Sequence, residues 1–339
     1  MSDVTHSPDL VIVPSAVVQQ VLDTLGKESK EIVERIYIEA AKGNLVNPDS
    51  LFLRPDPPRR ERVIALPAYV AGEPPVMGIK WISSFPGNLS LGLPRASALI
   101  ALNDPRTGFP RAVLEGARIS AHRTALSAAV GAEALREGDR AVERLAVVGT
   151  GYIADTTLRV LANLGWSCQQ VAVHDLDAER ARSFATEHAG TFPAGEMTVA
   201  GTLREALSGA DLVLFATTAV DPYVSTPDWF APGSVVLHMS LRDLTPAALA
   251  GASHVVDEVA HALREKTSLA LAVDEGTVAR EEVRPIGDHL RGEVRPDRSR
   301  TAIYAPFGLG SLDIAIGGLV AERAIGLEGV VTVPGFSAS

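Results

Sequence analysis

The segment RLAVVGTGYIA, residues 144–154, decides the fold of most of this 339-residue chain. It places Gly149, Gly151 and Ala154 in the order G-x-G-x-x-A, after an apolar strand pattern and before a helical pattern at 156–165. In this setting the first glycine permits a tight turn, the second lets the backbone approach a pyrophosphate, and the alanine lets helix and strand pack closely. Free amides at the helix N-terminus then point at the phosphates. The segment therefore predicts a dinucleotide-binding loop.

The residues around this loop alternate between strand and helix patterns from about 140 to 305. Apolar strands are expected at QQVAVHD (169–175), DLVLFATT (211–218) and GSVVLHMS (233–240), and helices at DAERARSFATEH (177–188) and TLREALSGA (202–210). Such alternation is typical of a parallel sheet with helices on its faces. We expect a Rossmann-type, doubly wound domain at residues 129–308.

The cofactor expected in this domain is NAD. Asp175 ends the second strand, where an acidic residue binds the ribose hydroxyls and repels a 2′-phosphate, although Arg180 and Arg182 leave NADP open. The alternative is that Asp175 or Asp177 only caps the next helix. Ligands lie beyond the carboxyl ends of parallel strands, so the end of the strand expected at 211–218 should also border the cofactor. The predicted cofactor-binding residues are Gly149, Thr150, Gly151, Tyr152, Ile153, Asp175, Ala216, Thr217 and Thr218.

The N-terminal part has a different pattern. Short apolar runs at 61–70, 76–85, 96–104 and 109–117 are separated by proline and glycine, and Asp104 to Gly108 reads as a hairpin turn. These features predict an antiparallel sheet. An apolar helix at 310–326 could return to this part of the chain. The predicted fold class is therefore α/β, with a second, α+β domain made from both termini, residues 1–128 and 309–339.

Lys80 is unexpected, because it stands in the apolar run VMGIKWISSF (76–85) and lysine is among the residues least often buried. Alternate strand residues share a face, so Gly78, Lys80 and Ile82 lie on one side. We expect Met77, Ile79 and Trp81 to form the core face, and Lys80 beside Gly78 to line a pocket. The alternative is a lysine at a strand edge that extends its amine to water.

Three arginines also flank apolar segments. Arg54 begins the proline-rich loop 54–60, Arg95 precedes an apolar strand, and Arg123 lies in the small-residue helix SAHRTALSAA (120–129). Arginine forks bind carboxylates through two hydrogen bonds, and lysine adds a point charge. Each residue alone is compatible with a solvated surface cation. As a set with Lys80, they predict a substrate that carries carboxylates.

The composition excludes several other classes. A net charge of −10 argues against nucleic acid as a partner. The lone Cys168 allows no intramolecular disulfide and has no metal-ligand spacing, so no metal is expected. The N-terminal MSDVTHSPDL lacks a signal-peptide pattern, and no apolar run approaches the ~20 residues of a membrane span. We expect a cytoplasmic protein.

Three motifs resemble the ornithine cyclodeaminase/μ-crystallin family over essentially the whole chain. They are Asp104-x-x-Thr107-Gly108-x-Pro110, Arg123-Thr124-Ala125 and GTGYIA (149–154). The resemblance implies an NAD-dependent homodimer whose N-terminal domain binds substrate and dimerises. It also implies that Arg54, Lys80 and Arg123 bind a substrate carboxylate, that Thr124 lies beside the cofactor, and that Asp243 is the catalytic aspartate.

The segment around Asp243 departs from the Gly-x-Asp-x-Pro-Gly pattern of cyclodeaminases. The alternative is a loop acid before a helix that Thr245 caps and Pro246 begins. Four other segments, KWISSFPGN (80–88), LPRASALIALND (93–104), LHMSLRDL (237–244) and APFGLGSLDIA (305–315), are similar to the family's 2,3-diaminopropionate dehydrogenase subgroup.

The subgroup implies oxidation of N-(1-amino-1-carboxy-2-ethyl)-glutamate by NAD to an imine, whose hydrolysis gives 2,3-diaminopropionate and 2-oxoglutarate for siderophore or peptide-antibiotic biosynthesis. This substrate has three carboxylates, which would give Arg95 a use as a further substrate ligand. The catalytic residues implied are Lys80, which orients a carboxylate, and Asp243 as the base that activates water. His122 and His238 are alternative bases.

Three other functions remain open for such a chain. They are ornithine cyclodeamination to proline and ammonia, reduction as in an imine reductase or alanine dehydrogenase, and binding without turnover as in μ-crystallin. The missing Asp-x-Pro-Gly pattern counts against the first, and the set of cations counts against the last.

Overall fold

The structure is a computed structural model of the chain that describes residues 9–55, 61–190 and 192–337. It divides into two compact units. The first unit contains Met1–Ile32, Asn44–Arg123 and Leu309–Ser339, and the second contains Val33–Gly43 and Thr124–Gly308. Residues 56–60, most of the predicted proline-rich loop, lie outside the described residues.

The second unit is built on an eight-stranded sheet in which every neighbouring pair is parallel, as predicted. Across the sheet the strands are β13 (Val283–Pro285), β12 (Ser253–Val256), β14 (Ala302–Tyr304), β11 (Val235–His238), β10 (Leu212–Phe215), β7 (Ala141–Val148), β8 (Ser167–His174) and β9 (Ala194–Val199). From β7 the chain proceeds to β8 and β9 on one side and to β10 and β11 on the other. The strand order therefore reverses between β7 and β10, where open α/β sheets bind ligands.

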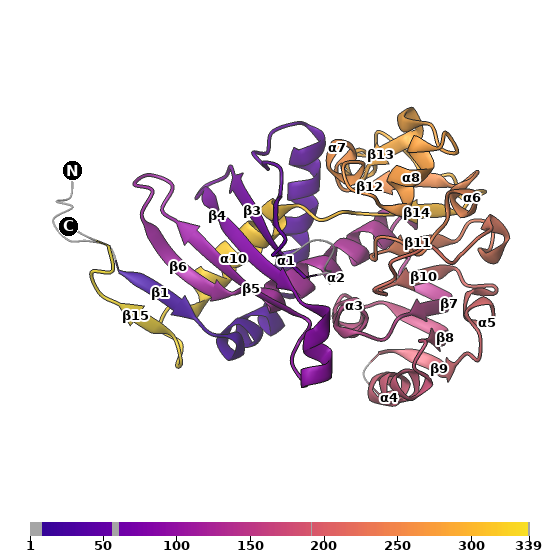
Figure 1. Cartoon of the computed structure of the whole chain (residues 1–339), viewed down its shortest axis with the longest axis horizontal. Helices are drawn as coiled ribbons and strands as arrows, with labels where there is room; N and C mark the ends of the chain where they lie inside the picture. The colour runs from indigo at the N-terminus through magenta and orange to yellow at the C-terminus, as the bar shows by residue number, and fades with distance from the viewer. Residues whose placement is uncertain (1–8, 56–60, 191, 338–339) are drawn as a thin grey trace. The chain divides into compact units, whose positions relative to one another are not determined.

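Helices in the second unit accompany this sheet (Figure 1). Besides the parts of α1 (Ser15–Ala41) and α2 (Gly116–Leu135) that belong to this unit, they are α3 (Tyr152–Asn163), α4 (Ala178–His188), α5 (Leu203–Leu207), α6 (Pro246–Leu249), α7 (Val259–Ala262), α8 (Ser268–Asp274) and α9 (Ile286–Leu290), with short 3-10 turns at Pro227–Trp229 and Arg280–Glu282. Their apolar faces pack on strand residues such as Val213, Phe215 and Val236, which are fully buried. This packing holds the carboxyl ends of the strands, where the predicted cofactor residues lie.

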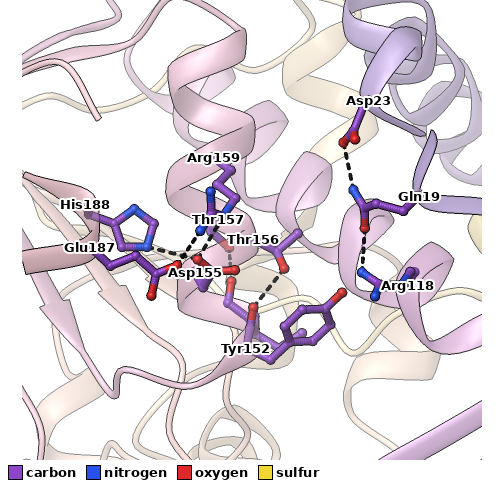
Figure 2. A network of polar contacts seen from close by, with 11 residues as sticks. Gln19, Asp23, Arg118, Tyr152, Asp155, Thr156, Thr157, Arg159, Glu187 and His188 are labelled. Carbon is purple, nitrogen blue, oxygen red and sulfur yellow. Dashed lines mark hydrogen bonds and ion pairs between the residues drawn. The ribbon is translucent and has the colours of Figure 1, made fainter. Parts of the chain in front are cut away.

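Polar contacts fix α4 against α3, the helix that follows the glycine loop (Figure 2). Asp155, in the first turn of α3, accepts from Arg159 at 2.9 Å and contacts the Nε2 of His188 at 3.0 Å. Arg159 also donates to Glu187 at 2.6 Å. Because Asp155 is four residues after Gly151, these contacts help to hold the helix start on which the loop depends.

The first unit is built on a seven-stranded sheet. Across the sheet the strands are β15 (Val331–Val333), β1 (Leu10–Val13), β6 (Pro110–Glu115), β5 (Ala96–Asn103), β4 (Val76–Ser84), β3 (Arg62–Val70) and β2 (Leu51–Leu53). Strands β3 to β6 form the predicted antiparallel meander, with a hairpin turn after Asp104. Strands β1 and β15 were not predicted, and they pair with each other at one edge of the sheet.

Three helices contribute to this unit: part of α1 (Ser15–Ala41), the start of α2 (Gly116–Leu135) and α10 (Gly310–Ala324). α1 is broken at Gly26, whose φ of 42° and ψ of −119° are not helical. α10 packs across β3, β4, β5 and β6, as Figure 1 shows. Residues of all three helices join strand residues in one apolar core.

The prediction of which face of β4 is buried was wrong. Lys80 is 2% exposed, whereas Trp81 on the other face is 40% exposed. The reason is that α10 lies on the Lys80 side of the sheet. The space expected beside Gly78 is also filled, because a side chain there would meet the backbone oxygen of Ala101 on β5 at 2.2 Å.

The division into units differs from the predicted boundaries at residues 33–43 and 124–128. Residues 33–43 group with the second unit, because α1 continues there against α9 and α2. The Tyr37 hydroxyl donates to Ser127 at 2.7 Å, and Gly287 is so close to Tyr37 that any side chain on it would clash with the Tyr37 carbonyl. In the part of the chain that the structure describes, no helix combines the length and apolar character needed to span a membrane.

Candidate active site

Lys80 lies in a buried trio of charged side chains in the first unit. Its Nζ donates to Asp313 Oδ2 at 2.7 Å and to Ser120 Oγ at 3.1 Å. Arg123 Nε donates to the other oxygen of Asp313 at 3.2 Å. We refer to Lys80, Arg123 and Asp313 as the charged trio. Two of the four predicted substrate ligands are thus brought together, by a carboxylate that the prediction did not include.

The trio leaves donors available on both cations. Lysine has three N–H donors and arginine five. Lys80 uses two of its donors, one to Asp313 and one to Ser120. Arg123 donates from Nε to Asp313 and from Nη2 to Ser120, and the second contact is long at 3.5 Å. The remaining donors can take a further carboxylate.

Burial and the neighbouring charges shift the pKa values of Lys80 and Asp313. Burial lowers the pKa of Lys80 to about 8, and Arg123 adds to this effect, while Asp313 opposes it. Burial alone would raise the pKa of Asp313, but Arg123 and Lys80 outweigh it and hold that pKa below its usual range. Lys80 is therefore a cation at neutral pH that loses its proton in mildly alkaline solution.

Arg54 and Arg95 also belong to the first unit, but no hydrogen bond or ion pair links either to the trio within the described residues. Arg54 is exposed after β2 and lies over the Phe52 ring at 4.8 Å. Arg95 is half-buried at the start of β5, and burial lowers the pKa of its guanidinium. Their predicted role as substrate ligands stays a prediction.

The glycine loop in the second unit has the features required of a phosphate-binding turn. Gly149 has a φ of 86°, and a side chain on it would meet the backbone of Ala216 at 2.9 Å. Ala154 is fully buried in α3. Tyr152 and Ile153 begin α3, and Thr218 is exposed beyond β10. Gly149 and Ala216 therefore lie together at the point where the strand order reverses.

Asp175 is tied to the same loop. Its Oδ2 accepts from the backbone nitrogen and the hydroxyl of Thr150, both at 2.8 Å. Its Oδ1 accepts from the Asp177 backbone at 3.0 Å. The cap of α4 is Asp177, which accepts from Glu179 and Arg180. The capping alternative is thus correct for Asp177, and Asp175 stays at the strand end where a ribose would bind.

Asp243 is the centre of a polar network at the carboxyl ends of β10 and β11. Its side chain accepts from Tyr223 OH at 2.7 Å and from the hydroxyls of Thr217 and Ser240, and it contacts His238 Nε2 at 3.0 Å. Its residue exposure is 0%. Burial raises its pKa, but His238, Ser240 and Thr217 outweigh burial and keep it ionised. Both carboxylate oxygens are therefore occupied.

The predicted role of Asp243 as the base stays a prediction, and its contacts bear on how freely water could approach it. A water would have to displace one of the four partners to reach the carboxylate. Thr245 caps α6 and Pro246 begins it, as in the alternative interpretation. Among the rival bases, His238 is buried against Asp243, and burial lowers the pKa of His122 to about 4, with its Nε2 3.2 Å from Ser29.

The sequence interpretation missed Asp313, Ser120, Ser240 and Tyr223. A signal for Asp313 was present, because it is the single charge in the otherwise apolar run GLGSLDIAIGGLVA (308–321). An isolated acid in an apolar helix indicates a buried partner of opposite charge. No group of His, Cys, Asp and Glu suited to a metal was found in residues 9–55, 61–190 and 192–337.

A parallel doubly wound sheet with a glycine loop at its switch point, joined to an α+β unit, defines a Rossmann-type protein of two units. More specifically, this chain belongs to the ornithine cyclodeaminase/mu-crystallin family, whose model matches residues 18–328.

Individual relatives agree with this assignment. The chain is 28% identical over 306 residues to N-((2S)-2-amino-2-carboxyethyl)-L-glutamate dehydrogenase of Staphylococcus aureus, covering 86% of this chain and 90% of the relative. Among solved structures it resembles CmnK, with 28% identity and a TM-score of 0.84 over 98% of this chain and 100% of that one. It also shares its fold with Delta(1)-pyrroline-2-carboxylate reductase of Thermococcus litoralis, solved with NADH and L-proline, with 23% identity and a TM-score of 0.83 over 93% and 97% of the two chains.

The network around Asp243 leads to a stability prediction. Asp243→Ala should lower the free energy of unfolding by ~3–5 kcal/mol, because it leaves buried polar partners without their acceptor. Urea unfolding followed by circular dichroism measures this change. Asp221→Ala, at an exposed position in the loop after β10 that also carries Thr217 and Tyr223, is the control and should change stability by no more than about 0.5 kcal/mol. Equal stabilities for the two variants would show that the network does not depend on Asp243.

Proposed function

We propose that this protein is an NAD-dependent dehydrogenase that oxidises a C–N bond in an amino acid with several carboxylates. The proposed substrate is N-(1-amino-1-carboxy-2-ethyl)-glutamate, and the products are 2,3-diaminopropionate and 2-oxoglutarate. The observation that carries the proposal is the charged trio, in which buried Lys80 and partly buried Arg123 share one carboxylate and keep donors for another. The similarity to the Staphylococcus aureus dehydrogenase supports the choice of substrate.

The reaction balances with one NAD and one water. Bound NAD would accept a hydride from the glutamate Cα of the substrate. The resulting imine adds water and releases 2,3-diaminopropionate, which leaves 2-oxoglutarate, NADH and a proton. In this proposal Lys80 and Arg123 hold the carboxylate next to the reacting carbon, which fixes its orientation. Arg54 and Arg95 would bind the remaining carboxylates.

The second unit provides residues that fit NAD. Gly149 allows the turn, Gly151 and the start of α3 offer backbone N–H groups, and Asp175 is available at the end of β8. Thr124 and the Ala216–Thr218 loop complete the proposed cofactor site. We propose that Asp243 orients Thr217 and Tyr223 at this edge of the sheet and acts as a positioning residue.

The alternative function is an ornithine cyclodeaminase or a related imine reductase or amino-acid dehydrogenase. It is favoured by the fact that the trio needs only one substrate carboxylate, as a smaller amino acid would supply. The reductase from Thermococcus litoralis has the same fold. The two functions differ in net NADH formation, because a cyclodeaminase recycles its NADH within each turnover.

We further propose that the protein is a cytoplasmic homodimer in siderophore or peptide-antibiotic biosynthesis. The strand register places apolar residues in a row across the face of the first sheet opposite α10: Pro67, Ile79, Ala101, Val113 and Ile12. Trp81 and Leu99 form an adjacent pair on this face and are both 40% exposed. An apolar surface of this kind on a family member suits a second copy of the chain.

The first test of the proposed function is absorbance of NADH. Purified protein with NAD should form NADH and 2-oxoglutarate from N-(1-amino-1-carboxy-2-ethyl)-glutamate, because the chemistry is a net oxidation. L-ornithine in parallel should give no NADH and no proline. Proline and ammonia from ornithine, without turnover of the first compound, would replace the proposal by the alternative.

The role of Arg123 is tested in the same assay. Arg123→Ala should lower kcat/KM by about 100-fold or more, because the reaction of a substrate held in the wrong position is slowed by about that factor. NAD binding, measured by calorimetry, should stay within about 2-fold, since Arg123 is not among the proposed cofactor ligands. A variant with wild-type kinetics would remove Arg123 from the site.

The cofactor assignment rests on Asp175. Asp175→Ala should weaken NAD binding about 10-fold, because hydrogen bonds between the carboxylate and the ribose are lost. NADP binding should improve or stay constant, so the preference for NAD over NADP should become smaller. Asp177→Ala is the matched control, since it loses only a helix cap and should leave both affinities unchanged. Unchanged affinities for Asp175→Ala would disprove the ribose role.

The proposed dimer face can be tested by charge. Trp81→Glu should convert the dimer to a monomer in sedimentation velocity, because it places a carboxylate in an apolar interface. Leu176→Glu changes a fully exposed side chain in the second unit and should leave the dimer intact. Dimerisation of Trp81→Glu at wild-type strength would assign the interface to another surface.

A further inference from the structure

Asp313 has an environment that few carboxylates have in folded proteins. Its residue exposure is 0%, and it lies in the first turn of α10, where the helix dipole favours a negative charge. Both oxygens are used, Oδ2 by Lys80 and Oδ1 by Arg123. It does not reach solvent, and its charge is directed at these two cations.

We propose that Asp313 is the positioning residue of the carboxylate site: it sets the trio to one net positive charge and aims the remaining donors of Lys80 and Arg123 at a single substrate carboxylate. The inference deepens the proposed function and rests on it for the identity of the substrate. The role of Asp313 itself follows from contacts within the first unit.

The net charge of the trio depends on Asp313. Two cations and one carboxylate leave a net charge of +1, so one bound carboxylate makes the site neutral. Without Asp313, two positive charges would lie close together in a buried position, at a high cost in desolvation and repulsion. With a second acid, the site would have no charge left to attract an anion.

The geometry of the trio also depends on Asp313. Lys80 comes from β4, Arg123 and Ser120 come from α2, and Asp313 comes from α10. Each oxygen of Asp313 takes one cation, and Ser120 lies within reach of both. The same carboxylate therefore fixes Lys80 and Arg123 relative to each other.

Asp313 also favours the protonated form of Lys80. The residues directly opposite it on β3 and β5 are Leu66 and Ile100, which carry no charge. The charged groups that act on it are Asp313 from α10 and Arg123 from α2. Burial and Arg123 lower the pKa of Lys80, and Asp313 is the group that keeps the amine protonated at neutral pH.

The decisive experiment follows Lys80 directly by NMR in protein labelled with [ε-13C]lysine. The other lysines are Lys27, Lys30, Lys42 and Lys266, and Lys80→Arg assigns the Lys80 signal. The wild type should titrate with a midpoint near 8. Asp313→Asn should lower this midpoint by about one pH unit or more, because the neutral amide no longer favours the charged amine. Ser120→Ala removes an uncharged partner and should shift it by a few tenths at most.

The same variants are then compared in kcat/KM across pH. A protonated Lys80 is required for carboxylate binding, so wild-type kcat/KM should fall as pH rises through the midpoint. In Asp313→Asn this fall in kcat/KM, the alkaline limb of the pH profile, should move to lower pH together with the NMR midpoint of Lys80. Asp313→Glu keeps the charge but displaces it, so kcat/KM should fall while the limb stays in place.

An unchanged Lys80 midpoint in Asp313→Asn would overturn the proposal. If neither Asp313 variant folds, Arg123→Gln provides the test: it removes the neighbouring cation, so the Lys80 midpoint should rise, and an unchanged midpoint would equally overturn the proposal. Failure of the proposed function looks different. The Lys80 midpoint would still respond to Asp313, which supports the positioning role, while the wild type formed no NADH from the proposed substrate.

Discussion

The burial of Lys80 is the constraint on which the first unit depends. A lysine that is 2% exposed in the middle of a sheet is stable only with a partner of opposite charge. The partner, Asp313, is 233 residues away in sequence and reaches the sheet because α10 returns across it. The same helix covers the apolar core of this unit. The packing of α10 on the sheet therefore both covers the apolar core and brings Asp313 to Lys80.

The second unit uses a buried carboxylate in a comparable way. Asp243 has no exposed surface and four side-chain partners, two of which, Thr217 and Tyr223, stand at the edge where the glycine loop lies. In each unit an acid that the solvent does not reach holds more accessible groups in place. Both polar sites should be rigid, because several donors bind each buried carboxylate at the same time and restrict its movement.

Much of the architecture could be predicted from the sequence. Strand and helix periodicity gave the parallel sheet and the antiparallel meander, and the glycine spacing located the loop at the switch point. Periodicity also showed that Gly78, Lys80 and Ile82 share a face, but not which face α10 would cover, since that depends on a segment far away in the chain. For the same reason Asp313 was missed, and the short strands β1 and β15 carry too little pattern to reveal that they pair. The prediction for Asp243 rested on a family motif whose surrounding residues differ here.

In the proposed function, the charged trio binds a substrate carboxylate. The most direct measurement is a crystal structure of the protein grown with NADH and 2-oxoglutarate, the proposed products. The account predicts one carboxylate of 2-oxoglutarate within hydrogen-bond distance of both Lys80 Nζ and the Arg123 guanidinium, with Asp313 still paired to each. A 2-oxoglutarate bound away from both cations, with the trio closed on itself, would contradict it.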